Sequence, residues 1–164
     1  MISIDLAFAI AVPLYIANST PVLIKGKSAI DFKRNAWDHR RIFGDGKTWE
    51  GLVGGVCAGT LAGLVESLLF PPLMNFKLGF VLALGALLGD LVAAFFKRRL
   101  GLKRGDPAPI LDQLDFVIGG LGIAWLLGYT FSLYAILIVM VATPFFHLLT
   151  NAIAYLLGLK SVPW

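Results

Sequence analysis

The sequence predicts an all-α, polytopic membrane protein with about five transmembrane helices and two basic loops. Hydrophobic residues make up 58% of the 164 residues, and charged residues make up only 15%. Soluble proteins average about half apolar and about a quarter charged residues, so the mean hydropathy of +0.82 indicates a lipid-solvated chain. The length fits a single domain, residues 1–164.

Apolar runs of spanning length recur along the chain and predict the helices. A spanning helix needs about 20 mostly apolar residues. Five runs qualify, at residues 6–24, 52–73, 78–96, 114–129 and 131–157. Only a short turn near Gly128 separates the last two, but their combined length is far too great for one span. We see no alternation typical of strands and no internal repeat, which indicates one helical domain.

The basic residues indicate how these runs cross the membrane, because cytoplasmic loops carry an excess of Lys and Arg. Thirteen of the 14 basic residues lie in residues 25–51, in residues 97–113 or at Lys160, and Lys77 alone lies on the other side. We therefore expect a multi-pass protein of the cell membrane with its N-terminus outside and both loops cytoplasmic. Membrane topology also explains the net charge of +4 without a nucleic-acid partner.

Three aspartates within or beside the apolar runs are costly, and such acids usually face a cavity or a partner. Asp90 lies roughly 9 Å inside the end of the third run at 1.5 Å per residue. Asp112 and Asp115 begin the fourth run with i, i+3 spacing, which places both carboxylates on one face. Converging carboxylates repel unless cations intervene, and carboxylates with substrate phosphates suit Mg²⁺. We expect one or two Mg²⁺ ions here.

Two interpretations of these acids need no metal. The carboxylates can pair with neighbouring basic residues, namely Lys97, Arg98, Arg99 or Arg104. Asp112 can also act as a helix N-cap. Glu66 lies deeper in the second run, has no cation near it in sequence and receives no role.

A glycine-flanked stretch at residues 43–51, Phe-Gly-Asp-Gly-Lys-Thr-Trp-Glu-Gly, is the second unusual feature. Glycines on both sides of Asp45 let the backbone approach a ligand closely. Lys47 supplies a charge suited to phosphate, and we expect Thr48 to cap the second helix, whose N-terminal amides attract anions. The stretch is not a P-loop, because Arg41 stands where the first glycine is required and no strand precedes it. A structural turn followed by a helix cap is the alternative.

Polar residues also occur in the fifth run. His147 and Asn151 are four apart and therefore share one helix face. Such a pair is more typical of a helix-packing hydrogen bond than of a catalytic group.

Both unusual stretches resemble the integral-membrane CDP-diacylglycerol synthases. Residues 47–51 are similar to their Lys-Thr-Trp-Glu-Gly element. Their C-terminal signature resembles Gly89-Asp90, Lys97-Arg98, Gly101 and Leu111-Asp112-Gln113-Leu114-Asp115. The chain departs from it in a shortened stretch at residues 105–110 and in Gln113, which replaces an arginine. These departures, the small size and the Phe-Gly-Asp-Gly-Lys-Thr-Trp form are closer to the archaeal branch, the CDP-archaeol synthases.

The resemblance implies a CTP-dependent cytidylyltransferase. A membrane lipid phosphate, in the archaeal branch an unsaturated diether, attacks the α-phosphorus of CTP and pyrophosphate leaves. The matched motifs imply that Asp90 and Asp112 are the principal metal ligands and that Asp115 is a further ligand or an outer acid. They also place the stretch comprising Asp45, Gly46, Lys47 and Thr48 at the nucleotide.

The basic cluster of the second loop can serve this chemistry or the membrane. Lys97, Arg98 and Arg104 are candidates to hold the lipid phosphate or the triphosphate, with Lys97 at the reaction centre. Positive-inside topology and attraction to anionic head groups are the alternative explanation of the cluster.

Two other functions stay open from the residues. A polyprenol or dolichol kinase-like phosphotransferase would also use CTP, but with an alcohol acceptor and CDP as by-product. An ion-coupled transporter would use intramembrane acids without turnover, although the lack of a repeat argues against it.

Overall fold

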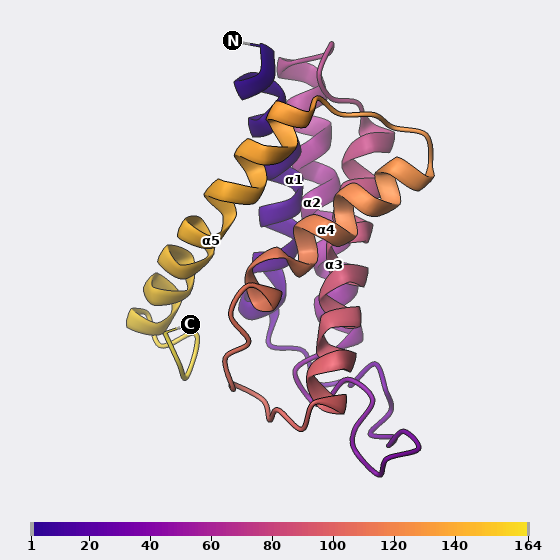
Figure 1. The fold of residues 1–164 in the computed structure, drawn as a ribbon, viewed down its shortest axis with the longest axis vertical. Helices are drawn as coiled ribbons and strands as arrows, with labels where there is room; N and C mark the ends of the chain where they lie inside the picture. Colours follow the sequence, from indigo (N-terminus) through magenta and orange to yellow (C-terminus); the bar gives the residue numbers. More distant parts are fainter. Residues whose placement is uncertain (1, 164) are drawn as a thin grey trace.

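Five helices form the protein, and the all-α prediction is confirmed (Figure 1). This computed structural model describes residues 2–163. The helices are α1 (Ile2–Ile24), α2 (Trp49–Leu69), α3 (Phe76–Arg99), α4 (Leu111–Leu126) and α5 (Leu133–Leu156). Among the described residues, the only β-structure is two isolated antiparallel bridges, which pair Ala29 with Thr48 and Asn35 with Arg41.

Four of the helices, α1, α2, α3 and α5, are long and apolar enough to cross a membrane. The fourth helix in the chain, α4, has 16 residues and therefore measures about 24 Å. That length is less than the roughly 30 Å of a hydrocarbon core. Figure 1 shows α4 crossing the bundle obliquely, from its interior to its edge. The chain is thus a multi-pass membrane protein, and five complete spans stay a prediction.

Side-chain caps set where two helices begin. Thr48 is the N-cap of α2, as predicted, and its hydroxyl accepts a hydrogen bond of 3.2 Å from Gly51 N. Asn75 caps α3 by accepting one of 2.9 Å from Leu78 N. These caps satisfy amide groups that have no partner within the helix, so both helices begin before the apolar runs themselves.

Small residues let the helix backbones approach closely. A Cβ on Gly63 would meet the backbone of Gly79, which joins α2 to α3. A Cβ on Gly89 would meet the backbone carbonyl of Asp115, which joins α3 to α4. Because lipid supplies no hydrophobic drive between helices, such close contacts are a main source of cohesion in membranes. The second contact also fixes the start of α4 beside the turn that carries Asp90.

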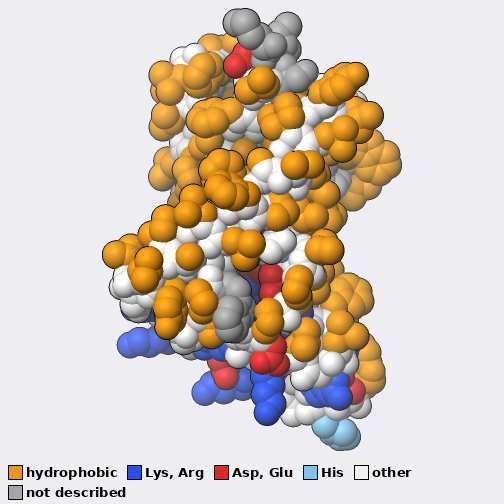
Figure 2. Space-filling model, turned by 60° about the vertical axis from the view of Figure 1, so that its left-hand side comes forward, with side chains coloured by type: hydrophobic (Ala, Val, Ile, Leu, Met, Phe, Trp, Pro, Cys, Tyr) orange, Lys and Arg blue, Asp and Glu red, His pale blue; other side chains and the backbone are white. Residues whose placement is uncertain are grey.

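Charge and apolar surface are separated along the bundle. The loop of residues 25–48 and the loop of residues 100–110 lie at one end, and the N-terminus lies at the other (Figure 1). Figure 2 shows Lys and Arg side chains gathered at the loop end, while hydrophobic side chains cover most of the rest of that face. This distribution agrees with the prediction that both basic loops lie on one side of the membrane.

Candidate active site

A cleft of about 1040 Å³ opens at the loop end of the bundle. A smaller cavity of about 240 Å³ adjoins it beneath Phe43 and Gly44. Ten predicted site residues line one or both of these spaces: Asp45, Gly46, Lys47, Thr48, Asp90, Lys97, Arg98, Arg104, Asp112 and Asp115. The structure therefore brings the two motif regions together, while the role of each residue stays a prediction.

Two lysine–aspartate pairs form the centre of the cleft. Lys47 Nζ donates hydrogen bonds to both carboxylate oxygens of Asp90. Lys97 Nζ lies 2.8 Å and 3.0 Å from the two carboxylate oxygens of Asp112. All four side chains are at most 29% exposed, so these pairs are partly shielded from water. The pairing of Asp112 with Lys97 is expected from the interpretation in which the acids pair with neighbouring basic residues. The other pair joins the glycine-flanked stretch, which contains Lys47, to helix α3, which contains Asp90.

Asp115 is the third carboxylate that lines the cleft, after Asp90 and Asp112. It is partly buried, and it forms no ion pair among residues 2–163. Its Oδ1 accepts a hydrogen bond of 2.6 Å from Phe116 N. Asp112 is not the N-cap of α4, because Ile110 holds that position. The carboxylate of Asp112 instead accepts a bond of 2.9 Å from Ala108 N, just before the helix.

Asp90 lies farther from the end of its helix than the apolar run suggested. Helix α3 continues to Arg99, so Asp90 is about 13 Å from its end at 1.5 Å per residue. The site can still receive water-soluble ligands, since the cleft runs from Asp90 to Lys25 and Gly26 at the loop end.

The donor set suits one mode of Mg²⁺ binding. Among the described residues no three His, Cys, Asp or Glu side chains surround a common point as a metal cage does. Mg²⁺, however, commonly uses one or two carboxylates together with substrate phosphates and water. Asp90, Asp112 and Asp115 line one open cleft and fit that mode once the lysines release them.

A buried carboxylate that the sequence did not reveal holds the glycine stretch in place. Asp31 has a fully buried side chain and accepts bonds of 2.6 Å and 3.2 Å from Arg41. It also accepts bonds from the backbone N–H groups of Lys33, Phe43 and Gly44 at 2.9–3.0 Å. Burial raises the pKa of Asp31, but these hydrogen bonds outweigh it and lower that pKa to about 2. In the sequence it is one of three aspartates in a basic loop, and nothing there distinguishes it from Asp38 or Asp45.

Arginines complete the attachment of this loop. Arg41 also bonds Asp45 at 2.6 Å, although the Asp45 side chain is 64% exposed. Arg98 donates to the carbonyl oxygens of Phe43 and Leu102, so it fastens the loop to α3. Arg104 lies beside Gly46 and faces both spaces of the cleft. Arg104 is thus better placed than Arg98 to meet a ligand.

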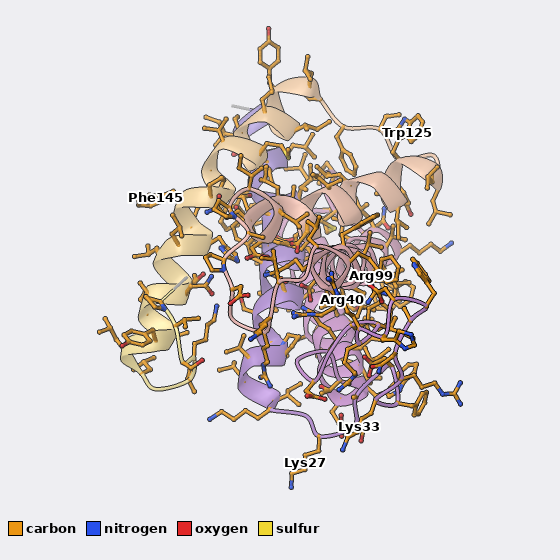
Figure 3. All side chains as sticks on the ribbon, turned by 60° about the horizontal axis from the view of Figure 1, so that its bottom comes forward. Lys27, Lys33, Arg40, Arg99, Trp125 and Phe145 are labelled. Carbon is orange, nitrogen blue, oxygen red and sulfur yellow. The ribbon has the colours of Figure 1, made fainter. Side chains whose placement is uncertain are left out.

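The outer part of the loop docks on the end of α3. Arg40 Nη1 donates to Arg99 O at 2.6 Å, and Arg99 Nη2 donates to Arg41 O at 2.6 Å. Figure 3 shows Arg40 and Arg99 together in this contact, whereas Lys27 and Lys33 point away from the bundle. Only part of the loop's positive charge therefore serves the cleft.

Comparison with known proteins identifies the family. A sequence profile described as CarS-like, CDP-archaeol synthase, matches residues 2–164. The chain belongs to this family. It is 46% identical to the CDP-archaeol synthase of Pyrococcus furiosus over 96% of both chains. It is 43% identical to that of Sulfolobus acidocaldarius over the full length of both, and 45% identical to that of Aeropyrum pernix over 96% of this chain and 91% of the relative.

A solved structure has the same architecture as this family member. It superposes with a TM-score of 0.85 at 42% identity, covering 90% of this chain and 94% of that one. It is described as an intramembrane enzyme for archaeal membrane lipids biosynthesis. The predicted archaeal branch of the CDP-diacylglycerol synthases is thereby confirmed, and CDP-archaeol synthases are cytidylyltransferases.

The cleft of this CDP-archaeol synthase family member has a second polar wall, and the sequence did not indicate that its residues converge there. It comes from the loop-side ends of α1 and α5 and from the C-terminal tail, and it consists of Asn18, Ser19, Lys25, His147, Asn151 and Lys160. The interpretation of His147 and Asn151 as a packing pair between helices is incomplete, because both line the cleft. We refer to these six residues as the α1/α5 wall.

Proposed function

We propose that the chain transfers the cytidylyl group of CTP to 2,3-bis-O-geranylgeranyl-sn-glycerol 1-phosphate, forming the CDP-linked lipid and pyrophosphate. The observation that carries this proposal is the pairing of Lys47 with Asp90 and of Lys97 with Asp112 in one cleft. A reaction between two polyanions needs cations that bind phosphate and carboxylates that bind a metal ion. Family membership over nearly the whole chain supports the same reaction.

The lysines have alternative partners once CTP enters. An ammonium group on a flexible stem moves readily from a carboxylate to a phosphate oxygen. Lys47 and Lys97 then neutralise the triphosphate, and Arg104 meets it from the loop side. Asp90, Asp112 and Asp115 are freed to hold Mg²⁺, which when bound supplies charge neutralisation at the α-phosphate and the pyrophosphate.

The chemical step places few other demands on the protein. An oxygen of the lipid phosphate forms a bond to the α-phosphorus of CTP, and the bond between that phosphorus and the bridging oxygen of pyrophosphate breaks. The attacking phosphate is already ionised at neutral pH, so no side chain has to remove a proton. Positioning and electrostatic stabilisation can carry most of the acceleration, as in other phosphoryl transfers.

The same proposal sets the orientation of the chain in the cell membrane. CTP is a cytosolic nucleotide, so the loop end of the bundle faces the cytoplasm and the N-terminus lies outside. The concentration of basic residues at the loop end supports this orientation.

The proposal is tested by a product assay on purified protein in bilayer nanodiscs. CTP, Mg²⁺ and the lipid phosphate should yield pyrophosphate and a CDP-lipid, measured by mass spectrometry. Asp90→Asn and Asp112→Asn should each lower kcat by about 100-fold or more, because each removes charge at the reacting phosphates. Asp5→Asn, a matched change at the opposite end of the bundle, should not alter kcat.

Other outcomes would identify the alternatives. A wild-type protein that forms no CDP-lipid with any lipid phosphate would refute the proposal. Release of CDP with a polyprenol acceptor would indicate a kinase instead. Ion flux into liposomes without nucleotide turnover would indicate a transporter.

A further inference from the structure

The cleft is polar on two sides, and only one side is occupied by the groups assigned to CTP. Gly46, Lys47, Asp90, Lys97 and Arg104 line both the large cleft and the small cavity. The α1/α5 wall lines only the large cleft. The large cleft, at about 1040 Å³ against about 240 Å³, therefore extends well beyond the groups assigned to the nucleotide.

We propose that the α1/α5 wall binds the phosphate of the lipid acceptor, with Lys160 as its cationic contact and the His147–Asn151 pair as its hydrogen-bonding contact. This inference rests on the proposed function, because it gives a place to the second substrate of that reaction. It also assigns a role to His147 and Asn151, whose position in the cleft is not explained by helix packing alone.

The His147–Asn151 pair is held beside the start of α4, and it lines the same cleft as the acids. Asn151 Nδ2 lies 3.2 Å from the His147 ring nitrogens, and the His147 ring stacks on Phe116 at 6.5 Å. Phe116 directly follows Asp115, so this contact joins α5 to the part of α4 that carries Asp112 and Asp115. Among the described residues the pair makes no hydrogen bond to another helix, although polar side chains within a membrane generally face a partner or a cavity. Here they face the cleft.

Lys160 brings a cation to the same wall from beyond the end of α5. The tail folds back so that Lys160 N donates to Ala154 O at 3.2 Å, which holds the side chain against the cleft. Burial lowers the pKa of Lys160, Asp112 raises it, and Lys97 and Lys47 lower it. Lys160 lines the same cleft as Lys97 and Asp112, so it adds a cation from the α1/α5 wall to those of the opposite side.

The outer surface of α5 suits a lipid better than a nucleotide. A hydrogen bond of 2.8 Å between the hydroxyls of Tyr15 and Thr143 joins α5 to α1, and beyond it α5 diverges from the bundle (Figure 1). Past that contact, Leu149, Ile153 and Leu156 are 45%, 47% and 82% exposed. Figure 2 shows acidic and basic side chains in a recess on this face, bordered by hydrophobic side chains.

An amphiphile can use both parts of this surface at once. Its phosphate reaches the polar wall from the side, while its chains stay on apolar surface in the bilayer. A free phosphate ion or a soluble phosphate ester gains only the polar contacts. We therefore expect the lipid, rather than a soluble phosphate, to be the occupant.

The test compares Lys160→Ala and Asn151→Ala with Lys27→Ala, a matched control whose side chain points to solvent at the same end. The first two variants should raise KM for the lipid phosphate about tenfold or more, since each loses a hydrogen bond to a charged group. KM for CTP should stay within about twofold of the wild-type value, and Lys160→Arg should recover most of the loss. Lys27→Ala should change neither constant.

A binding measurement keeps this inference separate from the proposed reaction. Native mass spectrometry of the protein with the lipid phosphate, without CTP, should show retention by the wild type and its loss in Lys160→Ala and Asn151→Ala. Equal retention by wild type and variants, or an equal rise in KM for both substrates, would overturn the inference. Competition by glycerol 1-phosphate or inorganic phosphate at concentrations similar to the lipid would also overturn it, because the site would then be one for soluble phosphate. A wild type that retains the lipid but makes no CDP-lipid would refute the reaction and leave the binding site standing.

Discussion

Replacing Asp31 with asparagine should weaken the attachment of the glycine stretch without changing any side chain that lines the cleft. The carboxylate accepts two hydrogen bonds from Arg41 and one each from the backbone of Phe43 and Gly44. Asparagine has nearly the same size but only one acceptor oxygen, and its NH₂ group faces groups that themselves donate. Arg41 would lose one of its two bonds to this side chain, and at least one backbone amide would lose its partner.

The size of this effect follows from the lowered pKa of Asp31. That pKa falls from 3.8 to about 2, and each pKa unit corresponds to about 1.36 kcal/mol. The ionised carboxylate therefore contributes about 2 kcal/mol to folding at neutral pH. Because the pKa is lowered in the folded state, this contribution is present above about pH 4 and is lost as the pH falls toward 2.

Urea unfolding in detergent at several pH values provides the measurement. Asp31→Asn should unfold with about 2 kcal/mol less free energy at pH 7, and the difference should shrink between pH 4 and pH 2. Asp5→Asn, an exposed acid at the opposite end, should change the free energy by less than about 0.5 kcal/mol. A loss below about 0.5 kcal/mol for Asp31→Asn at pH 7, or a loss that persists unchanged at pH 2, would refute this reasoning.

Two further substitutions test helix packing and the nucleotide site. Gly89→Ala should destabilise the protein by about 1–3 kcal/mol, because its Cβ would meet the backbone carbonyl of Asp115. Gly122→Ala, at a position open to space, should be neutral or slightly stabilising, and equal melting temperatures of the two variants would contradict the close contact. Lys47→Ala should raise KM for CTP about tenfold or more, since it removes the charged contact that we propose with phosphate. Lys33→Ala, in the same loop but pointing away from the bundle, is its control, and an unchanged KM in Lys47→Ala would remove that lysine from the nucleotide site.

The helices could be predicted because each one depends on a local run of apolar residues. The end of α3 could not, since Lys97, Arg98 and Arg99 look like loop residues in the sequence. In the structure they continue the helix, because Asp112 and the carbonyl groups of the facing loop neutralise or bind them. Tertiary contacts, rather than local hydropathy, decide such a boundary.

The convergence of the site residues and the pairing of Asp112 with a neighbouring basic residue could be predicted, but the partner of Asp90 could not. The i, i+3 spacing of Asp112 and Asp115 is a local property of one helix. The bond between Lys47 and Asp90 joins residues 43 apart, and no pattern in the sequence selects that pairing. The hydrogen bonds of Asp31 could not be predicted for the same reason, because the five N–H groups that donate to its carboxylate become neighbours only when the loop folds.

The two lysine–aspartate pairs have a consequence for the whole reaction cycle. A resting cleft whose ions are matched internally can lie within the membrane without exposing an uncompensated charge to a low dielectric. If ligand binds as proposed, we expect its entry to exchange ionic partners, so that its free energy is the difference between two sets of contacts. Such a difference is modest even when each contact is strong, and it allows the nucleotide product to leave after every turnover.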